Sequence, residues 1–591
     1  MIVRSTPVAK RWLHKRFPDQ PTEKVAIESL VQTLNISPFL AALLVQRKVT
    51  TFEEARTFFR PELSQLHDPF LMRDMDRATD RITRAMADGE KILVYGDYDV
   101  DGTTSVALMY GFLSTIYDRL EHYIPDRYKE GYGISKAGVA YAAENGFSLI
   151  IALDCGIKSI ERVAEAKSMG VDFIICDHHR PGDQIPDAVA VLDPKRADCN
   201  YPYDELTGCG VGFKLLQALC RVRGIPADTL WPYLDLVAVS ISCDIVPVTG
   251  ENRALAYFGL KQLNSSPRTG LCALLRIAGF VAPNELCPPP AKHLDVTNVV
   301  FGLGPRINAA GRIKHARAAV DLLLAKHHDE AEDFAYSLNL HNRDRQDFDK
   351  SMTEQALAMI EADEWLKNAK STVLYDASWN KGVIGIVASR CIERFYRPTI
   401  ILTQSNDKVS GSARSVAGFD VYEAIEACSD LLEQFGGHTF AAGLTLSVEN
   451  IKAFQEKFEK VVSASILDEH LTPKVDIDIP LDFSEIDAKF YRIMKQMSPF
   501  GPGNMAPVFC TEDVVLVGEP IIMKEKHLKF TCKQLGLGYT FTAVGFGMSA
   551  WADQLQRNEP FSICYSVEMN HFRDQSTIQL NLKDIRIQEA V

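Results

Sequence analysis

Residues 91–105 read KILVYGDYDVDGTTS, an apolar run followed at once by three acidic residues. The run Ile92–Tyr95 has the length and β-branched character of a buried strand. Asp97, Asp99 and Asp101 then occupy alternate positions before a segment of helical character. Carboxylates this close repel one another unless cations or protons neutralise them. Because ligands of open α/β sheets bind where a strand ends and a helix begins, the stretch predicts a metal site rather than a solvated turn.

The composition is that of an ordinary multidomain globular protein of 591 residues, with 46% hydrophobic and 24% charged residues. The thirteen cysteines form no C-x-x-C pair, so neither a disulfide framework nor a zinc site is indicated. The amino terminus lacks the apolar core of a signal peptide, and no run is long enough to span a membrane, so we expect a cytoplasmic protein. A net charge of −13 argues against coating of nucleic acid through bulk charge, although it leaves room for a local basic groove.

Strand-like and helix-like segments alternate between about residues 76 and 265. After the first strand, the candidate strands are 149–153, 172–176 and 188–192. This alternation implies a parallel sheet with helices on both faces.

Ionisable residues follow several of these apolar runs. Asp154 comes directly after the second strand, and Asp177, His178 and His179 come after the third. Asp244 ends another apolar run, which we expect to be a buried helix. Parallel strands bring their carboxyl ends to one edge of the sheet, so we expect these side chains to meet the first acidic loop.

Carboxylates with one or two imidazoles and no thiolate suit Mn²⁺ or Mg²⁺ better than zinc or copper. The number of carboxylates allows two ions, with Asp154 between them. Two ions about 3.5–4 Å apart let water attack a phosphorus atom and stabilise the leaving oxygen. His178 and His179 could instead be a buried pair that binds backbone carbonyls, but their position after a strand end favours one metal ligand and one phosphate contact.

Three regions later in the chain predict a phosphate-binding strip, a connecting helix and a second α/β unit. Residues 305–317 hold cations without an acidic residue, and nearby glycines allow close approach of a ligand, so they form a candidate phosphate-binding strip rather than a solvated basic face. Residues 327–366 predict a long, charged connecting helix. Residues 371–465 predict a second α/β unit whose glycine-rich helix start could hold an anion. The cations of the strip are Arg306, Arg312, Lys314 and Arg317.

From about residue 475 the chain shows short alternating runs that predict a small β-barrel. Aromatic residues in this part could stack on bases, although about half of them should belong to the core because strands alternate faces. The candidates are Phe530, Tyr539, Phe541 and Phe546.

Together these motifs resemble the DHH phosphoesterase superfamily, and within it the RecJ single-strand-specific DNA exonucleases. The four core motifs are DYDVDG, LDCG, DHH and SCDIVP. Further motifs of this family are FGLGPRINAAGRI at 301–313, WNKGVIGIVASR at 379–390, GSARSV at 411–416, FGGHTFAAG at 435–443 and SPFGPGN at 498–504.

The resemblance implies roles for individual residues. The implied metal ligands are Asp99, Asp101, Asp154, His178 and Asp244. Asp97 and Asp177 would be ligands or would orient them, and His179 would face the scissile phosphate. Substrate contacts would come from Arg306, Asn308, Arg312, Asn380, Arg390, Arg414, Gly436, Gly437 and His438. Asn380 departs from the usual histidine of the family, and composition alone would make Arg390 a surface residue.

The expected architecture is a multidomain α/β protein. We expect an amino-terminal helical extension (1–75), a parallel-sheet DHH catalytic domain (76–325), a long connecting helix (326–366), an α/β DHHA1 nucleotide-binding domain (367–470) and an OB-fold-like single-strand-binding barrel (471–591).

The resemblance implies a 5′→3′ exonuclease that uses two Mn²⁺ or Mg²⁺ ions to degrade single-stranded DNA to mononucleotides in recombination and repair. Single-strand-binding protein and a RecQ-type helicase are the partners expected of this family, with a monomer as the default. The first alternative is a DHH phosphodiesterase that acts on short oligonucleotides or cyclic dinucleotides, and the barrel argues against it. The second is a non-catalytic DNA-binding scaffold, and the complete set of ligands argues against that.

Overall fold

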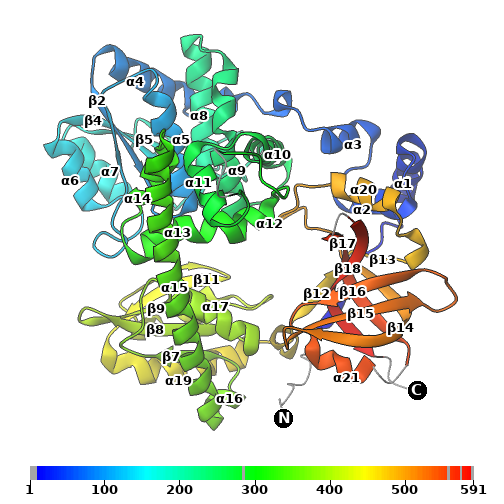
Figure 1. The fold of residues 1–591 in the computed structure, drawn as a ribbon. Coiled ribbons are helices and arrows are strands. Elements are labelled where there is room, and N and C mark those ends of the chain that lie inside the picture. The colour runs from blue at the N-terminus through cyan, green and yellow to red at the C-terminus, as the bar shows by residue number, and fades with distance from the viewer. Residues whose placement is uncertain (1–8, 283–286, 556–558, 573–574, 588–591) are drawn as a thin grey trace. The chain divides into compact units, whose positions relative to one another are not determined.

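The computed structural model describes residues 9–282, 287–555, 559–572 and 575–587. These residues form two compact units, and each is considered by itself (Figure 1). One unit contains residues 60–346 and 498–505. The other contains the described part of residues 1–59 together with residues 347–497 and 506–591. No helix in the described ranges has both the length and the apolar character needed to cross a membrane.

The first unit is built on a five-stranded sheet in which every neighbouring pair of strands is parallel, as the sequence predicts. The strand order is β3 (Leu120–Tyr123), β2 (Lys91–Gly96), β4 (Phe147–Leu153), β5 (Asp172–Cys176) and β6 (Ala190–Leu192).

Helices cover both faces of this sheet because its strands are apolar on both sides. Ile92 and Val94 face one core, and Leu93 and Tyr95 face the other. The first face is covered by α4 (Met75–Ala87), α5 (Val100–Leu113), α8 (Gly208–Arg223) and α9 (Leu234–Cys243), and the second by α6 (Lys136–Glu144) and α7 (Ile160–Ser168).

Further helices extend the first core. They are α10 (Gly250–Ser265), α11 (Thr269–Ile277), α12 (Val296–Asn298), α13 (Gly304–Ile313) and α14 (Arg317–Leu324). A disulfide joins Cys272 to Cys287, a single bridge rather than a disulfide framework. This bridge could not be predicted, because the two cysteines lie 15 residues apart without a recognisable motif. The predicted long helix is present as α15 (His328–Ala362), whose residues divide between the two units.

The second unit contains the predicted second α/β region. Its sheet has the order β10 (Gln434–His438), β11 (Ala441–Leu446), β9 (Lys408–Arg414), β8 (Thr399–Ser405) and β7 (Thr372–Tyr375). Only the β7–β8 pair is parallel. The accompanying helices are α16 (Glu364–Asn368), α17 (Ile384–Arg394), α18 (Val421–Glu426) and α19 (Ile451–Ser465).

The carboxyl-terminal strands close into the predicted barrel because β14 pairs with both β15 and β17. The strands are β13 (Ile479–Pro480), β14 (Phe509–Met523), β15 (His527–Gln534), β16 (Thr540–Gly545), β17 (Phe561–Phe572) and β18 (Gln575–Ile587). Helices α20 (Ala488–Gln496) and α21 (Ala552–Leu555) accompany them.

The segment expected as a single amino-terminal extension divides between the two units. Strand β1 (Arg11–His14) pairs in parallel with β12 (Lys474–Ile477), and Trp12 Nε1 donates a hydrogen bond of 2.8 Å to Asp584. Helices α1 (Pro21–Leu34), α2 (Pro38–Gln46) and α3 (Phe52–Phe59) complete this part, whereas residues 60–75 belong with the parallel sheet.

Candidate metal centre

The acidic loop after β2 leads directly into α5, as predicted. Asp99 is the N-cap of this helix, and its carboxylate accepts a hydrogen bond of 3.0 Å from the Gly102 amide. Asp97 and Asp101 on either side are only 2% and 1% exposed. The loop therefore brings its carboxylates into the protein, which excludes the solvated-turn interpretation.

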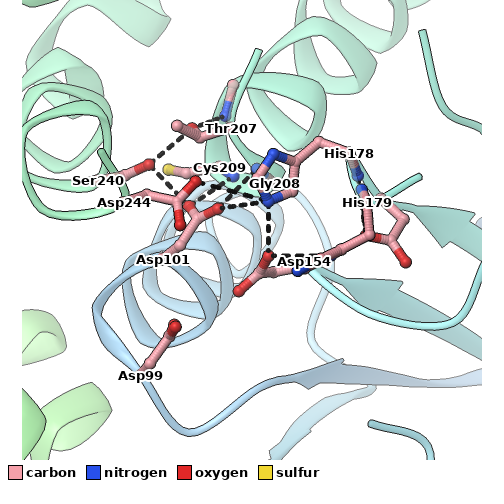
Figure 2. Close-up of polar contacts among 12 residues, drawn as sticks. Asp99, Asp101, Asp154, His178, His179, Thr207, Gly208, Cys209, Ser240 and Asp244 are labelled. Carbon is pink, nitrogen blue, oxygen red and sulfur yellow. Dashed lines mark hydrogen bonds and ion pairs between the residues drawn. The ribbon is translucent and has the colours of Figure 1, made fainter. Parts of the chain in front are cut away.

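Asp101 is held by the amino terminus of α8 (Figure 2). Its two oxygens accept hydrogen bonds from the amides of Gly208 (2.7 Å) and Cys209 (2.9 Å), and Ser240 Oγ donates another at 2.7 Å. The free amides of a helix amino terminus favour an anion. Sequence reasoning missed Gly208 and Ser240, and the only local signal was the Thr207-Gly-Cys-Gly helix start.

The predicted ligands from four segments meet around one imidazole. His178 Nε2 lies 3.2 Å from Asp154 Oδ1, 3.5 Å from Asp244 Oδ2 and 3.7 Å from Asp101 Oδ2 (Figure 2). Ligand atoms gather in three overlapping groups, each within 4.8 Å. These groups are Asp154, His178 and His179; Asp101, His178 and Asp244; and Asp97, Asp99 and Asp154.

The chemistry of these donors fits divalent cations. Burial, followed by repulsion from neighbouring carboxylates, raises the pKa of Asp97, Asp99, Asp154 and Asp244 above the ordinary range. Buried polar atoms without a partner are costly unless a ligand satisfies them. Such atoms here, among the described residues, are Asp97 Oδ1, Asp154 Oδ1, both ring nitrogens of His178 and Asp244 Oδ2.

Asp177 has a different environment from the proposed ligands. It accepts hydrogen bonds from the amides of Ile157 (2.9 Å), His178 (2.8 Å) and His179 (3.2 Å), and its Oδ1 lies 2.7 Å from His179 Nδ1. Burial would lower the pKa of His179, but the hydrogen bond and the charge of Asp177 raise it to about 9. Asp177 thus positions His179 and favours its protonated form.

Sequence reasoning also missed the tyrosine beside His179. Tyr132 is 58% exposed, and its hydroxyl lies 3.2 Å from His179 Nε2. Arg127 stacks over the ring of Tyr98 at 5.0 Å, and Tyr98 in turn contacts the ring of Tyr132. The stretch DRYKEGYG at 126–133, with aromatic and cationic residues after a short strand, was the available signal.

The basic strip (305–317) covers most of α13 and the residues that follow it. Its cations differ in whether the protein already occupies their hydrogen-bond donors. Arg306 donates to Asn339 (3.1 Å) and to the Gly302 carbonyl (2.6 Å), and burial lowers its pKa. Asn308 is half-buried on the same helix. The backbone carbonyl of Arg312 accepts a hydrogen bond from the Tyr128 hydroxyl.

The glycines expected to admit a ligand beside this strip serve packing instead. A Cβ at Gly302, Gly304 or Gly311 would meet Phe280, Cys243 or the Tyr98 carbonyl at 2.6–2.8 Å.

The predicted substrate residues of the second unit lie around β9, β10 and α17. Asn380 Oδ1 accepts a hydrogen bond of 2.8 Å from the Gly382 amide, so it caps a turn before α17. Arg390 is paired with Glu393 at 2.8 Å and with Asp349 at 3.9 Å. Arg414 donates to the Ala413 carbonyl (2.7 Å) and to Ser412 Oγ (3.2 Å).

Strand β10 places Gly436, Gly437 and His438 on an exposed surface. No atom lies within 4 Å of a Cβ built on Gly436, whereas Gly437 has φ of 155° and touches β11. The amide of Phe440 donates to His438 Nδ1 at 3.3 Å.

Three family models match consecutive parts of the chain. The DHH family N-terminal domain matches residues 91–241, the DHHA1 domain matches 368–464 and the RecJ OB domain matches 477–584.

Curated relatives and solved structures agree with these matches. "Single-stranded-DNA-specific exonuclease RecJ" of Bacillus subtilis is 37% identical over 98% of this chain and 71% of its own length. The protein of that name from Salmonella typhimurium is 31% identical over 98% and 99%. Crystal structures of Thermus thermophilus RecJ in complex with Mn²⁺ and with Mg²⁺ have TM-scores of 0.81 and 0.75, with 27% and 26% identity, 98% coverage of this chain and 80% and 79% of theirs. The chain therefore belongs to the RecJ family of DHH phosphoesterases.

Proposed function

We propose that this protein is a metal-dependent exonuclease that hydrolyses single-stranded DNA from the 5′ end to mononucleotides. The observation that carries the proposal is the convergence of carboxylates and His178 around unsatisfied buried ligand atoms. The relatives that cover nearly the whole chain carry the name of that activity. A role in DNA recombination and repair, and residence in the cytoplasm, are part of the proposal.

Asp99, Asp101, Asp154, His178 and Asp244 would hold two Mn²⁺ or Mg²⁺ ions, with Asp97 beside them. When bound, such ions supply a polarised water nucleophile and stabilise the charge of the leaving oxygen. Asp154 belongs to two of the three ligand groups and carries two carboxylate oxygens, so it could contribute to both ions, whereas His178 would contribute to one. The oxygens of Asp101 keep their orientation through the amides of α8, which reduces the reorganisation that binding requires.

His179 is the chain's own cation in this site. Asp177 fixes its Nδ1, and its Nε2, which contacts the Tyr132 hydroxyl at 3.2 Å, would exchange that partner for the substrate. An imidazolium at this place can donate a hydrogen bond to a phosphate oxygen and stabilise the charge that develops there.

The remaining residues that the sequence analysis assigned to substrate binding would contact the DNA strand. Arg306, Asn308 and Arg312 would contact its phosphates, while Arg414 with Gly436, Gly437 and His438 would contact the 5′-terminal nucleotide, and Asn380 would provide a hydrogen bond. Arg390 has carboxylate partners and would need to exchange them for phosphate. The barrel would hold downstream bases. Single-strand-binding protein and a RecQ-type helicase are the proposed protein partners of a monomeric enzyme.

The test uses one DNA oligonucleotide labelled at either end, with wild type and Asp154→Asn, in Mn²⁺, Mg²⁺ or EDTA. Asn matches Asp in size and tolerates the left-handed backbone at this position (φ 59°), so the variant removes charge while preserving the fold. We expect mononucleotides from the 5′ end, no cleavage in EDTA and at least a ~100-fold loss in the variant.

Other outcomes would identify the alternatives. Release from the 3′ end would overturn the polarity. Rapid cleavage of a dinucleotide with none of long DNA would indicate a small-substrate phosphodiesterase. Binding of DNA without cleavage in either metal would indicate a scaffold.

A further inference from the structure

Two thiols face each other across the strand pair that closes the barrel. Cys510 on β14 is the direct partner of Cys564 on β17 in this antiparallel ladder. The neighbouring pair, Phe509 and Tyr565, has its rings in contact on one face of the ladder. Because side chains alternate along a strand, the two cysteines lie together on the other face.

The backbone geometry brings these two cysteines as close as a ladder allows. The carbonyl of Cys510 accepts a hydrogen bond of 2.8 Å from the Leu481 amide, so the polar groups of Cys510 point towards β13 and away from β17. Cys510 and Cys564 are therefore a non-hydrogen-bonded pair. The Cα atoms of such a pair are about 4.5 Å apart, within the range of about 4.4–6.8 Å that a disulfide requires.

Strands β1 and β12 cover the two thiols. Cys510 and Cys564 form one apolar cluster with Val475 and Ile477 of β12, and the ring of Trp12 on β1 packs against this cluster. Cys510 is 2% exposed and Cys564 is 0% exposed. A dissolved reagent can therefore reach the thiols only when this cover opens locally.

The two thiols differ in how readily they ionise. A hydrogen bond from the Cys564 thiol lowers the pKa of Cys510, and the positive charge of Arg586 acts in the same direction. Burial raises the pKa of Cys564, and its hydrogen bond to Cys510 raises it further. Since the thiolate is the reactive form, Cys510 has the character of the attacking thiol and Cys564 that of the thiol that resolves the product.

We propose that Cys510 and Cys564 are a site of reversible oxidation, at which a peroxide converts the two thiols into a disulfide that joins β14 to β17. The bond would fix the ladder that closes the barrel. A cross-link between residues far apart in the sequence stabilises a fold mainly by restricting the unfolded chain. The oxidised barrel should therefore resist unfolding better than the reduced one.

The reaction has two steps. The Cys510 thiolate attacks one oxygen of hydrogen peroxide, the O–O bond breaks, and hydroxide leaves and takes up the proton that the thiol released. The Cys564 sulfur then attacks the resulting sulfenic acid, the S–O bond breaks, and the thiol proton leaves with the hydroxyl group as water. Two thiols and one peroxide thus give one disulfide and two waters, and the two electrons lost by the sulfur atoms reduce the peroxide.

The test treats the reduced, full-length, Mg²⁺-loaded protein with graded hydrogen peroxide, blocks the remaining thiols with N-ethylmaleimide and analyses a non-reduced digest by mass spectrometry. We expect a peptide pair linked through Cys510 and Cys564 that disappears on treatment with dithiothreitol. Calorimetry should show the barrel of the oxidised protein unfolding at a temperature at least about 5 °C higher.

Single substitutions identify the order of the steps. In Cys564→Ala the reaction should stop at the sulfenic acid, so dimedone should label Cys510. In Cys510→Ala dimedone should label Cys564 about tenfold less, because its thiol ionises less readily. Trp12→Ala removes part of the cover, so the cross-link should form at least about tenfold faster than in wild type.

Cys532→Ala is the matched control. Cys532 is a buried thiol of the same barrel, but it lies opposite Leu516 and Phe541, and its thiol donates a hydrogen bond of 3.6 Å to the Phe541 carbonyl. This substitution should leave both the yield of the cross-link and its effect on the unfolding temperature as in wild type.

Three results would overturn the proposal. The first is the absence of the linked pair at peroxide concentrations that oxidise the blocked-thiol count elsewhere in the chain. The second is a cross-link from Cys510 or Cys564 to a different cysteine. The third is an unchanged unfolding temperature once the cross-link is complete. None of these readouts uses DNA, so the outcome is independent of whether the protein proves to be an exonuclease.

Discussion

Asp154 follows β4 in a left-handed backbone conformation (φ 59°) and packs against the first residue of α8. A Cβ at Gly208 would lie 2.6 Å from Asp154 Cβ and 2.7 Å from its Cα. We therefore expect Gly208→Ala to displace Asp154 and to lower kcat about 100-fold, since small displacements of ligands have effects of that order.

Gly210→Ala is the matched control for this displacement. It lies in the same first turn of α8, and its added Cβ would make ordinary contacts of 3.4 Å with Leu206 and 3.5 Å with Thr207. Its kcat should stay within about threefold of wild type. Equal activity of the two variants would contradict the proposed packing at Asp154.

The raised pKa of His179 predicts how the stability of the metal-free protein depends on pH. Burial lowers the pKa of His179, but Asp177 raises it to about 9, well above the ordinary value of about 6.5. The folded protein therefore holds a proton that the unfolded chain has released, so this stability is complete below about pH 6.5 and is lost as pH rises towards 9. Burial lowers the pKa of His178 to about 4, so His178 is neutral in both states above pH 7 and adds no slope.

The unfolding temperature in EDTA should thus fall between about pH 7 and about pH 8.5. The raised carboxyl pKa values act in the same direction, because these groups favour the protonated form. In His179→Asn the fall should be smaller. A fall of equal size in wild type and variant would show that the proton resides elsewhere.

The convergence of the proposed ligand residues could be predicted because each follows an apolar run that locates it at the end of a strand or helix. Asp244 illustrates this, since the predicted helix ends at Cys243 and Asp244 is its C-cap. The groups that orient the ligands could not be predicted in the same way. Ser240 reaches Asp101 only because α9 packs on α5, and that contact has no local pattern in the sequence.

At the scale of single elements, the barrel strands sort their aromatic residues into core and surface. Phe530 is 2% exposed, and Phe541 packs edge-on against Phe483 at 5.1 Å. Tyr539 and Phe546 are 51% and 64% exposed. The exposed pair can stack on bases, whereas Phe530 belongs to the core.

Phe546→Ala should therefore weaken binding of single-stranded DNA by about 1–3 kcal/mol without changing the unfolding temperature. Phe530→Ala should instead destabilise the barrel by about 3–5 kcal/mol. Fluorescence anisotropy in EDTA measures the first effect, and thermal unfolding measures the second. Unchanged DNA affinity of Phe546→Ala would place the strand on another surface of the barrel.

The sequence predicted these strands but not which aromatic residues face outward. The alternation of side chains along a strand tells which face of the sheet each residue occupies only while the pairing register of the strand is regular. Strand β14 shifts register against β15 between Val517 and Ile521, and against β17 between Thr511 and Val514. Such bulges are set by closure of the barrel, so the period-two pattern cannot be carried through them.

At the scale of the whole chain, the order of the domains could be predicted because each has its own hydrophobic pattern. The pairing of β1 with β12 could not, since it joins two short strands that lie far apart in the sequence. Trp12 is central to this pairing, because it donates to Asp584, a residue only 3% exposed, and lies 4.3 Å from the Arg586 guanidinium.

Trp12→Ala should therefore destabilise the barrel, as it removes a packed ring and leaves the buried Asp584 without its donor. The expected loss is about 2–4 kcal/mol. Calorimetry of the full-length chain should show the barrel unfolding at a lower temperature, and a binding measurement should show reduced affinity for single-stranded DNA.

Trp365→Ala is the control because that ring is 47% exposed on α16, and the substitution should cost less than about 0.5 kcal/mol. Equal unfolding temperatures for the two variants would mean that the amino-terminal strand does not support the barrel, and the DNA-binding defect should then be absent as well.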